Sequence, residues 1–384
     1  VVFHKNLGPL ISAEEMTRCI HCTRCVRFGQ EIAGVMELGM RGRGEHSEIV
    51  TFVGRTVDSE LSGNMIDLCP VGALTSKPFR YAARTWELAR RKSVSPHDSL
   101  GSNLVVQVKG DRVMRVLPLD NEAVNECWIS DRDRFSYEAL GSAERLASPR
   151  VKVNGEWRDV DWATALEVVA GGLKDVASKH GGSAIGVLAS SQSTLEELAL
   201  VSRLARGLGC GNVDHRLRQA DFSDDSALAG IPWLGMPIAD LGTLDRVLVV
   251  GSFLRKDHPL IAQRLRQAAK RGAQVTMLHA VDDDWLMPVA HKAIVPPSGM
   301  PAALAAIVVA AAQGAGKPVP AALAGIEPRA SAQAIAASLL AGSKRAVFLG
   351  NAAMQHAEAA QIRALGQALA EILGATLGTL VEGA

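Results

Sequence analysis

Residues 18–28 read RCIHCTRCVRF, and residues 67–74 read DLCPVGAL. Three cysteines spaced C-x2-C-x2-C point their thiolates inward from one tight loop, and a remote Cys-Pro supplies a fourth ligand. All-cysteine iron-sulfur clusters are held in this way. The spacing therefore predicts one 4Fe-4S cluster in the N-terminal part of the chain. Its expected iron ligands are Cys19, Cys22, Cys25 and Cys69.

Other uses of these four cysteines remain open from the residues alone. Zinc also accepts four cysteines, but its usual signature is two C-x2-4-C pairs, which a third cysteine three residues after the second does not match. A disulfide framework is disfavoured because 384 residues contain only six cysteines. Free cysteines that pack as small hydrophobes are the last alternative. The spacing favours the iron-sulfur interpretation.

The residues around the cysteines predict local structure. The segment VRFGQEIAG after Cys25 predicts a helix that ends at Gly34, with its amino end toward the anionic cluster. Ser12 and Glu15 form a capping-box pattern, which predicts a short helix leading into the ligand loop. Pro70 directly after Cys69 is expected to open another helix, because proline suits the first helical position.

Length and composition bound the remaining possibilities. A chain of 384 residues is expected to form two or three domains with a large buried core. The net charge of +1 and the aromatic content of 4% argue against nucleic acid as a partner. The longest apolar run, ALAAIVVAAA from Ala303, is too short to cross a bilayer, so we expect no direct membrane insertion.

Three regions of the chain differ in sequence texture. Residues 1–85 are expected to form one 4Fe-4S module, residues 90–145 a small β-rich module, and residues 146–384 an α/β domain. In the second region, LVVQV and RVMRVL flank a turn at Gly110. Two runs of β-forming residues around a short turn predict a hairpin.

The third region alternates strand and helix patterns. Helices are predicted at residues 165–180, from Ser193 onward, and at residues 258–273; strands are predicted at residues 183–190, 245–252, 274–281 and 345–353. Such alternation builds a doubly wound parallel sheet.

Two glycine turns follow strands of this predicted sheet. Gly251 and Gly350 stand where such sheets bind nucleotides, but neither belongs to a G-x-G-x-x-G or Walker motif. We therefore expect them only to turn the chain off a strand. His258 before Pro259 is expected to form a capping turn and to have no catalytic role.

The chain resembles the large iron-sulfur subunit (the G or 75-kDa type) of proton-pumping NADH:quinone oxidoreductase, respiratory complex I. The segments MTRCIHCTRCVRFGQEIAG and IDLCPVGALTSKPFRYAARTWE carry the match, and GSNLVVQVKGDRVMRVLP and GVLASSQSTLEELALVSRLARGLGCGNVDHRLRQ extend it. The resemblance implies that the four cysteines hold one tetranuclear cluster, which relays electrons from NADH and flavin toward quinone. It places no complete active site and no catalytic residue in this chain, because oxidoreductase activity belongs to the assembly.

The same resemblance implies cofactors, partners and a location. The full-length subunit is expected to carry a 2Fe-2S and a second 4Fe-4S cluster upstream of Val1. The chain would then be a fragment that lacks the N-terminal ferredoxin-like domain and further material at its other end. Expected partners are other peripheral-arm subunits of complex I, including the flavin and NADH-binding subunit and the downstream iron-sulfur subunits. The expected location is peripheral, on the cytoplasmic side of the bacterial inner membrane.

The region beyond the first module resembles molybdopterin-dependent oxidoreductases, formate dehydrogenase among them. Those enzymes carry four cysteines for another tetranuclear cluster, and a cysteine or selenocysteine that ligates molybdenum. Ala220 falls at the latter position and cannot bind a metal, and Cys127 has no cysteine partners. Hydroxyls and a carboxylate replace the four thiolates poorly. We therefore expect no second cluster, no molybdopterin and a non-catalytic α/β domain. The four replaced positions are Ser95, Asp98, Ser102 and Ser130.

Three functions follow from these observations. The first is an electron-relay subunit of complex I. The second is a molybdopterin-dependent oxidoreductase, or the related subunit of a NAD-linked formate dehydrogenase or hydrogenase, which Ala220 and the missing cysteines disfavour. The third is a zinc-bearing scaffold protein, which the identity of the bound metal would decide.

Overall fold

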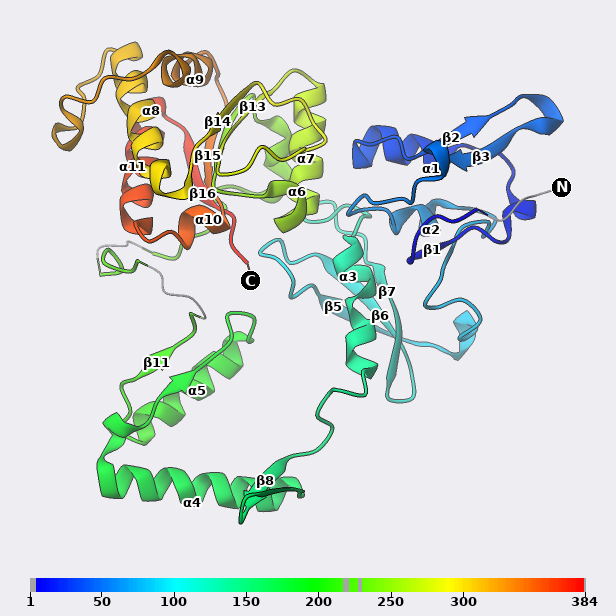
Figure 1. The fold of residues 1–384 in the computed structure, drawn as a ribbon, viewed down its shortest axis with the longest axis vertical. Coiled ribbons are helices and arrows are strands. Elements are labelled where there is room, and N and C mark those ends of the chain that lie inside the picture. The colour runs from blue at the N-terminus through cyan, green and yellow to red at the C-terminus, as the bar shows by residue number, and fades with distance from the viewer. Residues whose placement is uncertain (1–4, 217–220, 227–229, 383–384) are drawn as a thin grey trace. The chain divides into compact units, whose positions relative to one another are not determined.

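The computed structural model describes residues 5–216, 221–226 and 230–382 (Figure 1). The described residues form two compact units. The first unit contains the residues up to Tyr137 together with those after the second unit. The second unit begins at Glu138 and ends with the residues that precede the first gap.

A parallel sheet of five strands lies at the centre of the C-terminal half of the first unit, in the order β14-β13-β12-β15-β16. Its central strands read RVLVV and RAVFL, and nearly every side chain in them is buried. Parallel strands covered on both faces have such continuous apolar sequences. The predicted parallel sheet is confirmed. The strands are β12 (Arg246–Val250), β13 (Gln274–His279), β14 (His291–Ile294), β15 (Arg345–Leu349) and β16 (Thr376–Thr379).

Helices cover both faces of this sheet, as a doubly wound fold requires (Figure 1). Successive side chains of a strand point to opposite faces. Val247 and Val249 of β12 therefore join one core cluster with α7, and Leu248 and Val250 join another with the helices of the opposite face. The first face carries α6 (Leu254–Asp257) and α7 (Pro259–Lys270); α8 (Met300–Gly314), α9 (Ala330–Leu340) and α11 (Ala359–Leu373) pack on the other, and α10 (Asn351–Met354) precedes α11.

Helix α8 contains the apolar run from Ala303. Together with the preceding turn it extends over Pro297–Gly314, 18 residues, which is a length and composition that could cross a membrane. The helix is thus longer than the apolar run alone indicated. Over half of this window, 56%, is buried inside the structure, and Leu304 and Val308 are fully covered. The helix is a core helix of the sheet domain.

The N-terminal module contains the cysteine segment. Helix α1 (Arg24–Phe28) continues through a π-turn, η2 (Gly29–Ala33), and ends at Gly34, whose φ of +82° suits glycine. The predicted end of this helix is confirmed. The remaining elements are the 3-10 turn η1 (Met16–Arg18), helix α2 (Asn64–Leu68), the antiparallel ribbon β2 (Leu38–Arg41) and β3 (Glu48–Thr51), and the pair β1 (Ile11–Ser12) and β4 (Thr75–Ser76).

Two local predictions for this module are wrong. Ser12 lies in strand β1, and the short helix after it is a 3-10 turn that Glu15 precedes without a side-chain cap. Pairing of β1 with β4 uses the backbone of Ser12, so the capping-box pattern is overridden by a tertiary contact. Pro70 opens a turn and no helix.

A three-stranded antiparallel sheet, β5-β6-β7, follows the module. The predicted hairpin is confirmed, because β6 and β7 pair around Gly110, which has a φ of +58°. Helix α3 packs beside β7. The elements are β5 (Ala89–Val94), β6 (Asn103–Lys109), β7 (Arg112–Pro118) and α3 (Asp131–Phe135).

The second unit has a small core around Ile185, Ala205 and Cys210. Its two predicted helices are confirmed, although the second is capped one residue later, by Thr194 with Glu197. The predicted buried strand over residues 183–190 shortens to two residues. The elements are β8 (Arg150–Val153), β9 (Glu156–Asp159), α4 (Trp162–His180), β10 (Val187–Leu188), α5 (Leu195–Gly207) and β11 (Val213–Asp214).

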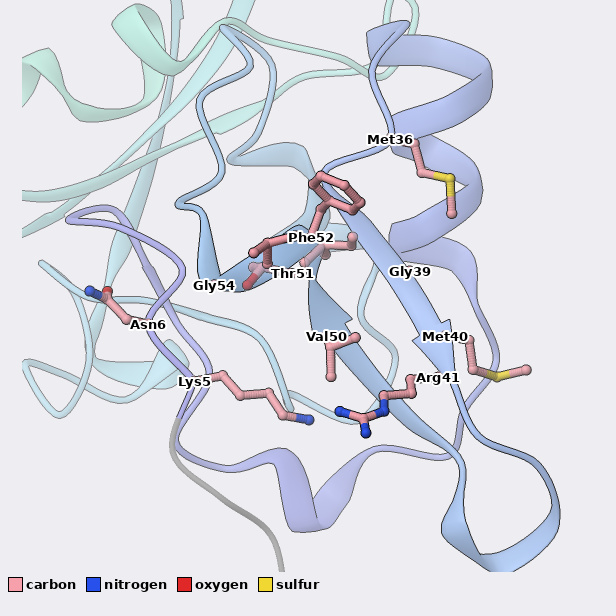
Figure 2. Close-up of a pocket in the computed structure, with 12 residues that line it drawn as sticks. Lys5, Asn6, Met36, Gly39, Met40, Arg41, Val50, Thr51, Phe52 and Gly54 are labelled. Atoms are coloured by element: carbon pink, nitrogen blue, oxygen red, sulfur yellow. The ribbon is translucent and has the colours of Figure 1, made fainter.

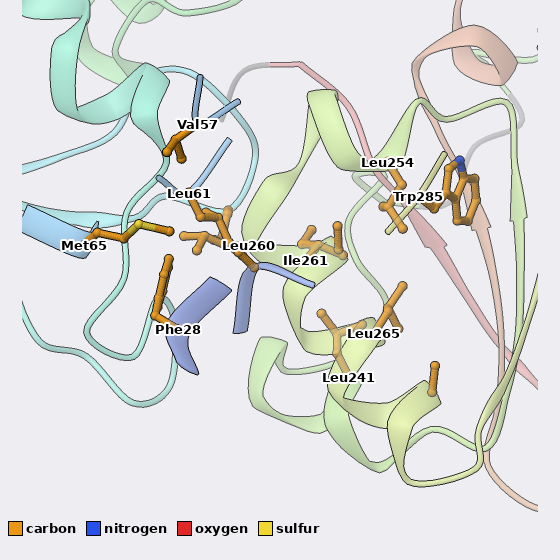
Figure 3. Close-up of a cluster of buried hydrophobic side chains, with 14 of the residues drawn as sticks. Phe28, Val57, Leu61, Met65, Leu241, Leu254, Leu260, Ile261, Leu265 and Trp285 are labelled. Carbon is orange, nitrogen blue, oxygen red and sulfur yellow. The ribbon is translucent and has the colours of Figure 1, made fainter. Parts of the chain in front are cut away.

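Helix α7 is shared by the sheet and the N-terminal module. Phe28 and Met65 of the module belong to the same buried cluster as Leu260 and Leu265 of α7 (Figure 3). Ten of the twelve residues of α7 are buried, so the helix is covered on more than its sheet-facing side. The module is therefore packed directly against the α/β domain.

Replacing Ile261 by Ala tests this shared core. Ile261 is 2% exposed on α7, and we expect the substitution to lower the free energy of unfolding by about 2–5 kcal/mol, because a buried cavity forms. Ile231→Ala is the matched control, since Ile231 is 86% exposed and should change the value by less than about 0.5 kcal/mol. Urea unfolding of the full chain measures both. Equal effects of the two substitutions would contradict the packing.

Asp131 at the start of α3 generates a pH-dependent prediction. Its carboxylate accepts hydrogen bonds from Ser62 Oγ at 2.5 Å and from the Gly63 amide at 2.6 Å. Burial nevertheless raises the pKa of Asp131 from 3.8 to about 6. The neutral form is thus favoured in the folded chain, and its contribution to stability is lost as the pH rises from about 4 through about 6.

Asp131→Asn should remove this loss, because asparagine stays neutral. We expect the free energy of unfolding of the variant, relative to the parent chain, to rise between pH 4 and pH 7, the range that brackets the two pKa values of Asp131. Urea unfolding at the two pH values provides the measurement. A difference that does not depend on pH would show that Asp131 ionises normally.

Candidate iron-sulfur centre

The four predicted ligands line one small pocket of the N-terminal module: Cys19, Cys22, Cys25 and Cys69. Cys19 follows the 3-10 turn, Cys25 lies in the first turn of α1, and Cys69 follows the last residue of α2. All four are partly buried free thiols. The rest of the wall is mainly apolar, from residues such as Met16, Ile49 and Leu74. The fold thus brings together the run of three cysteines and their remote partner.

The loop that carries three of these thiols has a specific backbone shape. His21 and Thr23 are both in the left-handed region, with φ of +52° and +59°. Non-glycine residues adopt this conformation at a cost, and they do so most often where function requires it. Thr23 Oγ1 donates a hydrogen bond to the Cys22 carbonyl at 2.8 Å. His21 itself is exposed.

Two backbone amides point at the sulfur of Cys69. The amides of Ala73 and Leu74 donate to its Sγ at 3.2 and 3.4 Å. Amide donors to a ligand sulfur stabilise its anionic form and tune the reduction potential of a bound cluster. The turn after Pro70 therefore supplies hydrogen bonds to the thiolate, in place of the predicted helix.

Ionisation of the Cys25 thiol is unfavourable in this pocket. The pKa of the Cys25 thiol is raised to about 11, chiefly by burial and to a smaller extent by the neighbouring Cys19, Cys69 and Cys22, against the opposing hydrogen bond from the Val26 backbone. Four thiolates in this pocket consequently require a compensating positive charge. Bound iron supplies such a charge, and thiolates are its preferred soft ligands in clusters.

The donor set therefore fits an iron-sulfur cluster in its chemistry. Four thiols, amide donors to a sulfur and apolar walls are the features that hold and insulate such a group. Within the part of the chain that the structure describes, no three His, Cys, Asp or Glu side chains are arranged around a single metal-ion position. The four thiols line the same pocket, but their sulfur atoms are not directed at one common position.

A second, wider groove follows the ribbon of β2 and β3 (Figure 2). Lys5 and Asn6 lie on one side of it, and the exposed side chains of Met36 and Phe52 contribute to the other. Its lining contains none of the four cysteines. The groove is thus a separate feature from the candidate centre.

The four positions predicted to have lost cluster ligands are all buried: Ser95, Asp98, Ser102 and Ser130. Ser130 caps α3 by accepting the Asp133 amide at 3.1 Å, and the Ser95 hydroxyl donates to the Asp133 carboxylate. The structure thus joins two of these serines through Asp133, a residue that was not predicted to be part of this group. The spacing Ser130-x-x-Asp133 resembles a capping box and was the signal available.

Asp98 lies in the same buried polar group. Its Oδ1 accepts the Leu100 amide at 3.0 Å. Burial raises the pKa of the Asp98 carboxyl, and the nearby Asp133 raises it further. Internal contacts therefore occupy most of this polar group.

Cys127 is exposed, and burial of part of its side chain raises the pKa of its thiol.

The two glycine turns of the sheet pack closely together. A Cβ on Gly251 would lie 2.5 Å from the Ala353 nitrogen, and one on Gly350 would lie 2.3 Å from the Ser252 Cβ. The approach of the two turns leaves no space there for a side chain, which supports their interpretation as chain turns.

His258 precedes α7 but makes no side-chain cap. Its ring is buried, with Nε2 3.1 Å from the Val381 carbonyl. The capping prediction therefore holds for Pro259 at the first helical position and not for the imidazole.

Ala220 lies outside the described residues. Cys210 is buried in the second unit, where its thiol donates to the Ile185 carbonyl.

Three family models match successive parts of the chain. Residues 145–379 match molybdopterin oxidoreductase, residues 8–75 the ferredoxin-like domain of NADH-quinone oxidoreductase subunit 3, and residues 88–138 the 4Fe-4S domain of the NADH-ubiquinone oxidoreductase NDSU1/NuoG-like type. Since the first of these covers more than half of the sequence, the chain belongs to the molybdopterin oxidoreductase family.

Particular relatives define the similarity more narrowly. The G-type subunit of NADH-quinone oxidoreductase from Rickettsia felis is 40% identical over 269 residues, which are 70% of this chain and 39% of that protein. The NADH-ubiquinone oxidoreductase 75 kDa subunit of Reclinomonas americana is 39% identical over 285 residues, 70% of this chain and 40% of that protein. The resemblance to this type of large subunit is confirmed, and the chain spans about two fifths of the length of these relatives.

A solved structure agrees with the fold. Acetylene hydratase from Pelobacter acetylenicus superposes with a TM-score of 0.55 at 14% identity, over 73% of this chain and 43% of that one. At this identity the likeness concerns the fold alone.

Serine substitutions test the ligand assignment. Cys22→Ser should abolish or strongly alter the cluster, because an alcohol replaces one of four thiolates. Cys127→Ser should leave the cluster intact, since Cys127 is exposed and is not among the residues that line the pocket. Iron content and the visible absorption spectrum of the two variants are the measurements. Loss of the spectrum in the Cys127 variant alone would overturn the assignment.

Proposed function

We propose that this chain belongs to an electron-relay subunit of NADH:quinone oxidoreductase. One 4Fe-4S cluster, held by Cys19, Cys22, Cys25 and Cys69, would pass electrons that originate from NADH and flavin toward quinone. The observation that carries the proposal is the shared pocket of the four thiols, with two amides donating to the Cys69 sulfur. The similarity to large subunits of the G and 75-kDa types supports it.

The residues of the module have separate tasks in this function. The bound cluster accepts and releases single electrons; the protein makes and breaks no covalent bond. Met16, Ile49 and Leu74 keep water from the sulfurs. The amides of Ala73 and Leu74 favour the more negative, reduced state and thereby raise the reduction potential.

The α/β domain has a structural role in this proposal. Ser95, Asp98, Ser102 and Ser130 offer no thiolate for a second cluster, and Ala220 offers no ligand for molybdenum. We therefore propose that this chain carries a single cluster and no molybdopterin. The domain supports the module through α7 and contacts neighbouring subunits.

Partners and location follow from the relay role. Electrons must arrive from a flavin and NADH-binding subunit and leave toward the downstream iron-sulfur subunits of the peripheral arm. The NADH dehydrogenase activity then belongs to the assembly, because this chain presents no complete active site. The subunit would be peripheral, on the cytoplasmic side of the bacterial inner membrane, with no nucleic acid partner.

Metal and sulfide analysis tests the proposal directly. Iron, zinc, acid-labile sulfide and pterin are measured per chain after anaerobic purification, together with a low-temperature EPR spectrum of the dithionite-reduced protein. We expect about four irons and four sulfides, the content of one 4Fe-4S centre, with one cluster signal.

The other outcomes each contradict a part of the proposal. About eight irons and sulfides, the content of two such centres, would mean that the buried serines and Asp98 do not mark a lost site. Zinc without sulfide would indicate a scaffold protein. Bound pterin would indicate a molybdopterin-dependent oxidoreductase.

A further inference from the structure

Side chains of α7 hold the C-terminal end of the helix that carries Cys25. Arg266 Nη1 donates to the Ile32 carbonyl at 2.7 Å, and Gln267 Nε2 donates to the Glu31 carbonyl at 2.5 Å. Lys270 pairs with the Glu31 carboxylate. The last carbonyls of a helix lack partners within the helix and carry its negative dipole end. Three side chains of α7 thus serve this end of the ligand helix.

Arg266 occupies the central place among these contacts. It is 3% exposed, and its Nε also donates to the Leu286 carbonyl at 2.8 Å. A Cβ on Gly34 would lie 2.2 Å from the Arg266 Nε and 2.6 Å from the Leu286 oxygen. The glycine that ends the helix therefore leaves the space through which the guanidinium reaches the Ile32 carbonyl.

The helix transmits this constraint to the ligand loop. It runs without a break from Arg24 through the π-turn to Ala33, so Cys25 and Ile32 lie near its two ends. Phe28, halfway along, is packed into the buried cluster shared with α7. Fixing the carbonyl end of so short a helix fixes its amino end, where Cys25 and the preceding Cys22 stand.

We propose that Arg266 is a positioning residue for the cluster, through which the α/β domain sets the place of Cys25 and Cys22. This inference rests on the proposed cluster at the four cysteines. It assigns to α7 a role in the properties of the cluster, beyond packing. Lysine cannot replace Arg266 in this role, because a single ammonium does not span the Leu286 and Ile32 carbonyls as the planar guanidinium does.

The chain offers a matched control on the same helix. Arg264 is 8% exposed and donates to the Glu122 and Val124 carbonyls at 3.1 and 2.9 Å. These carbonyls do not belong to the ligand helix. Arg264→Gln thus removes a comparable buried arginine from α7 and leaves the contacts of Arg266 in place.

The experiment compares Arg266→Gln, Arg266→Lys and Arg264→Gln in the full chain. Each is measured by circular dichroism, EPR, midpoint potential and the rate of iron loss to a chelator. We expect both Arg266 variants to show shifted EPR g-values, a changed potential and iron loss faster by about tenfold, the factor that corresponds to about 1.4 kcal/mol. The Arg264 variant should match the parent chain.

Several results would overturn the proposal. A folded Arg266→Gln variant with the EPR spectrum and midpoint potential of the parent chain would do so. Equal changes in the Arg264 variant would also do so, because they would show that the effect comes only from the packing of α7 against the module. Full rescue by lysine would show that only the charge matters. If Arg266→Gln does not fold, Gln267→Ala replaces it, with a smaller shift of the same signals expected and no shift counting against the proposal. A parent chain without iron and sulfide would instead refute the proposed function.

Discussion

The burial of the Cys25 thiol beside three other cysteines is the constraint on which the N-terminal module depends. Burial and three neighbouring thiols raise the pKa of Cys25 to about 11, because each opposes the formation of its thiolate. A pocket with that property holds together as four thiolates only around positive charge. The left-handed residues of the loop and the amides behind Cys69 are the local means by which the chain meets this requirement.

The same requirement explains why the module packs against a much larger domain. Its helices are short and its strands have two or four residues, and its buried side chains join the same hydrophobic cluster as those of α7. Phe28 and Met65 complete their packing on α7, and three polar side chains of α7 reach the end of the ligand helix. The sheet domain thereby serves the cysteines without contributing a ligand from its described residues to their pocket.

The sequence predicted well those features that depend on local pattern. The strands RVLVV and RAVFL, the hairpin around Gly110 and the helix end at Gly34 were predictable because apolar periodicity and glycine conformations act over a few residues. The cysteine spacing likewise indicated which thiols share a pocket. Ser12 and Pro70 were misjudged because strand pairing and a turn around a sulfur outweigh their helix-cap preferences. The contact of Arg266 with Ile32, 234 residues apart in sequence, has no local signature at all.

The all-round burial of α7 bears on how such a chain can change over generations. In the proposed function the α/β domain performs no reaction of its own, and a domain without a reaction is ordinarily free to shrink or disappear. Here deletion of the sheet domain would expose Phe28 and Met65 to solvent and would remove Arg266, the donor to the Ile32 carbonyl. On the proposed function, selection for the cluster alone would therefore preserve the α/β fold, and would tolerate drift wherever that fold does not face the cysteine module.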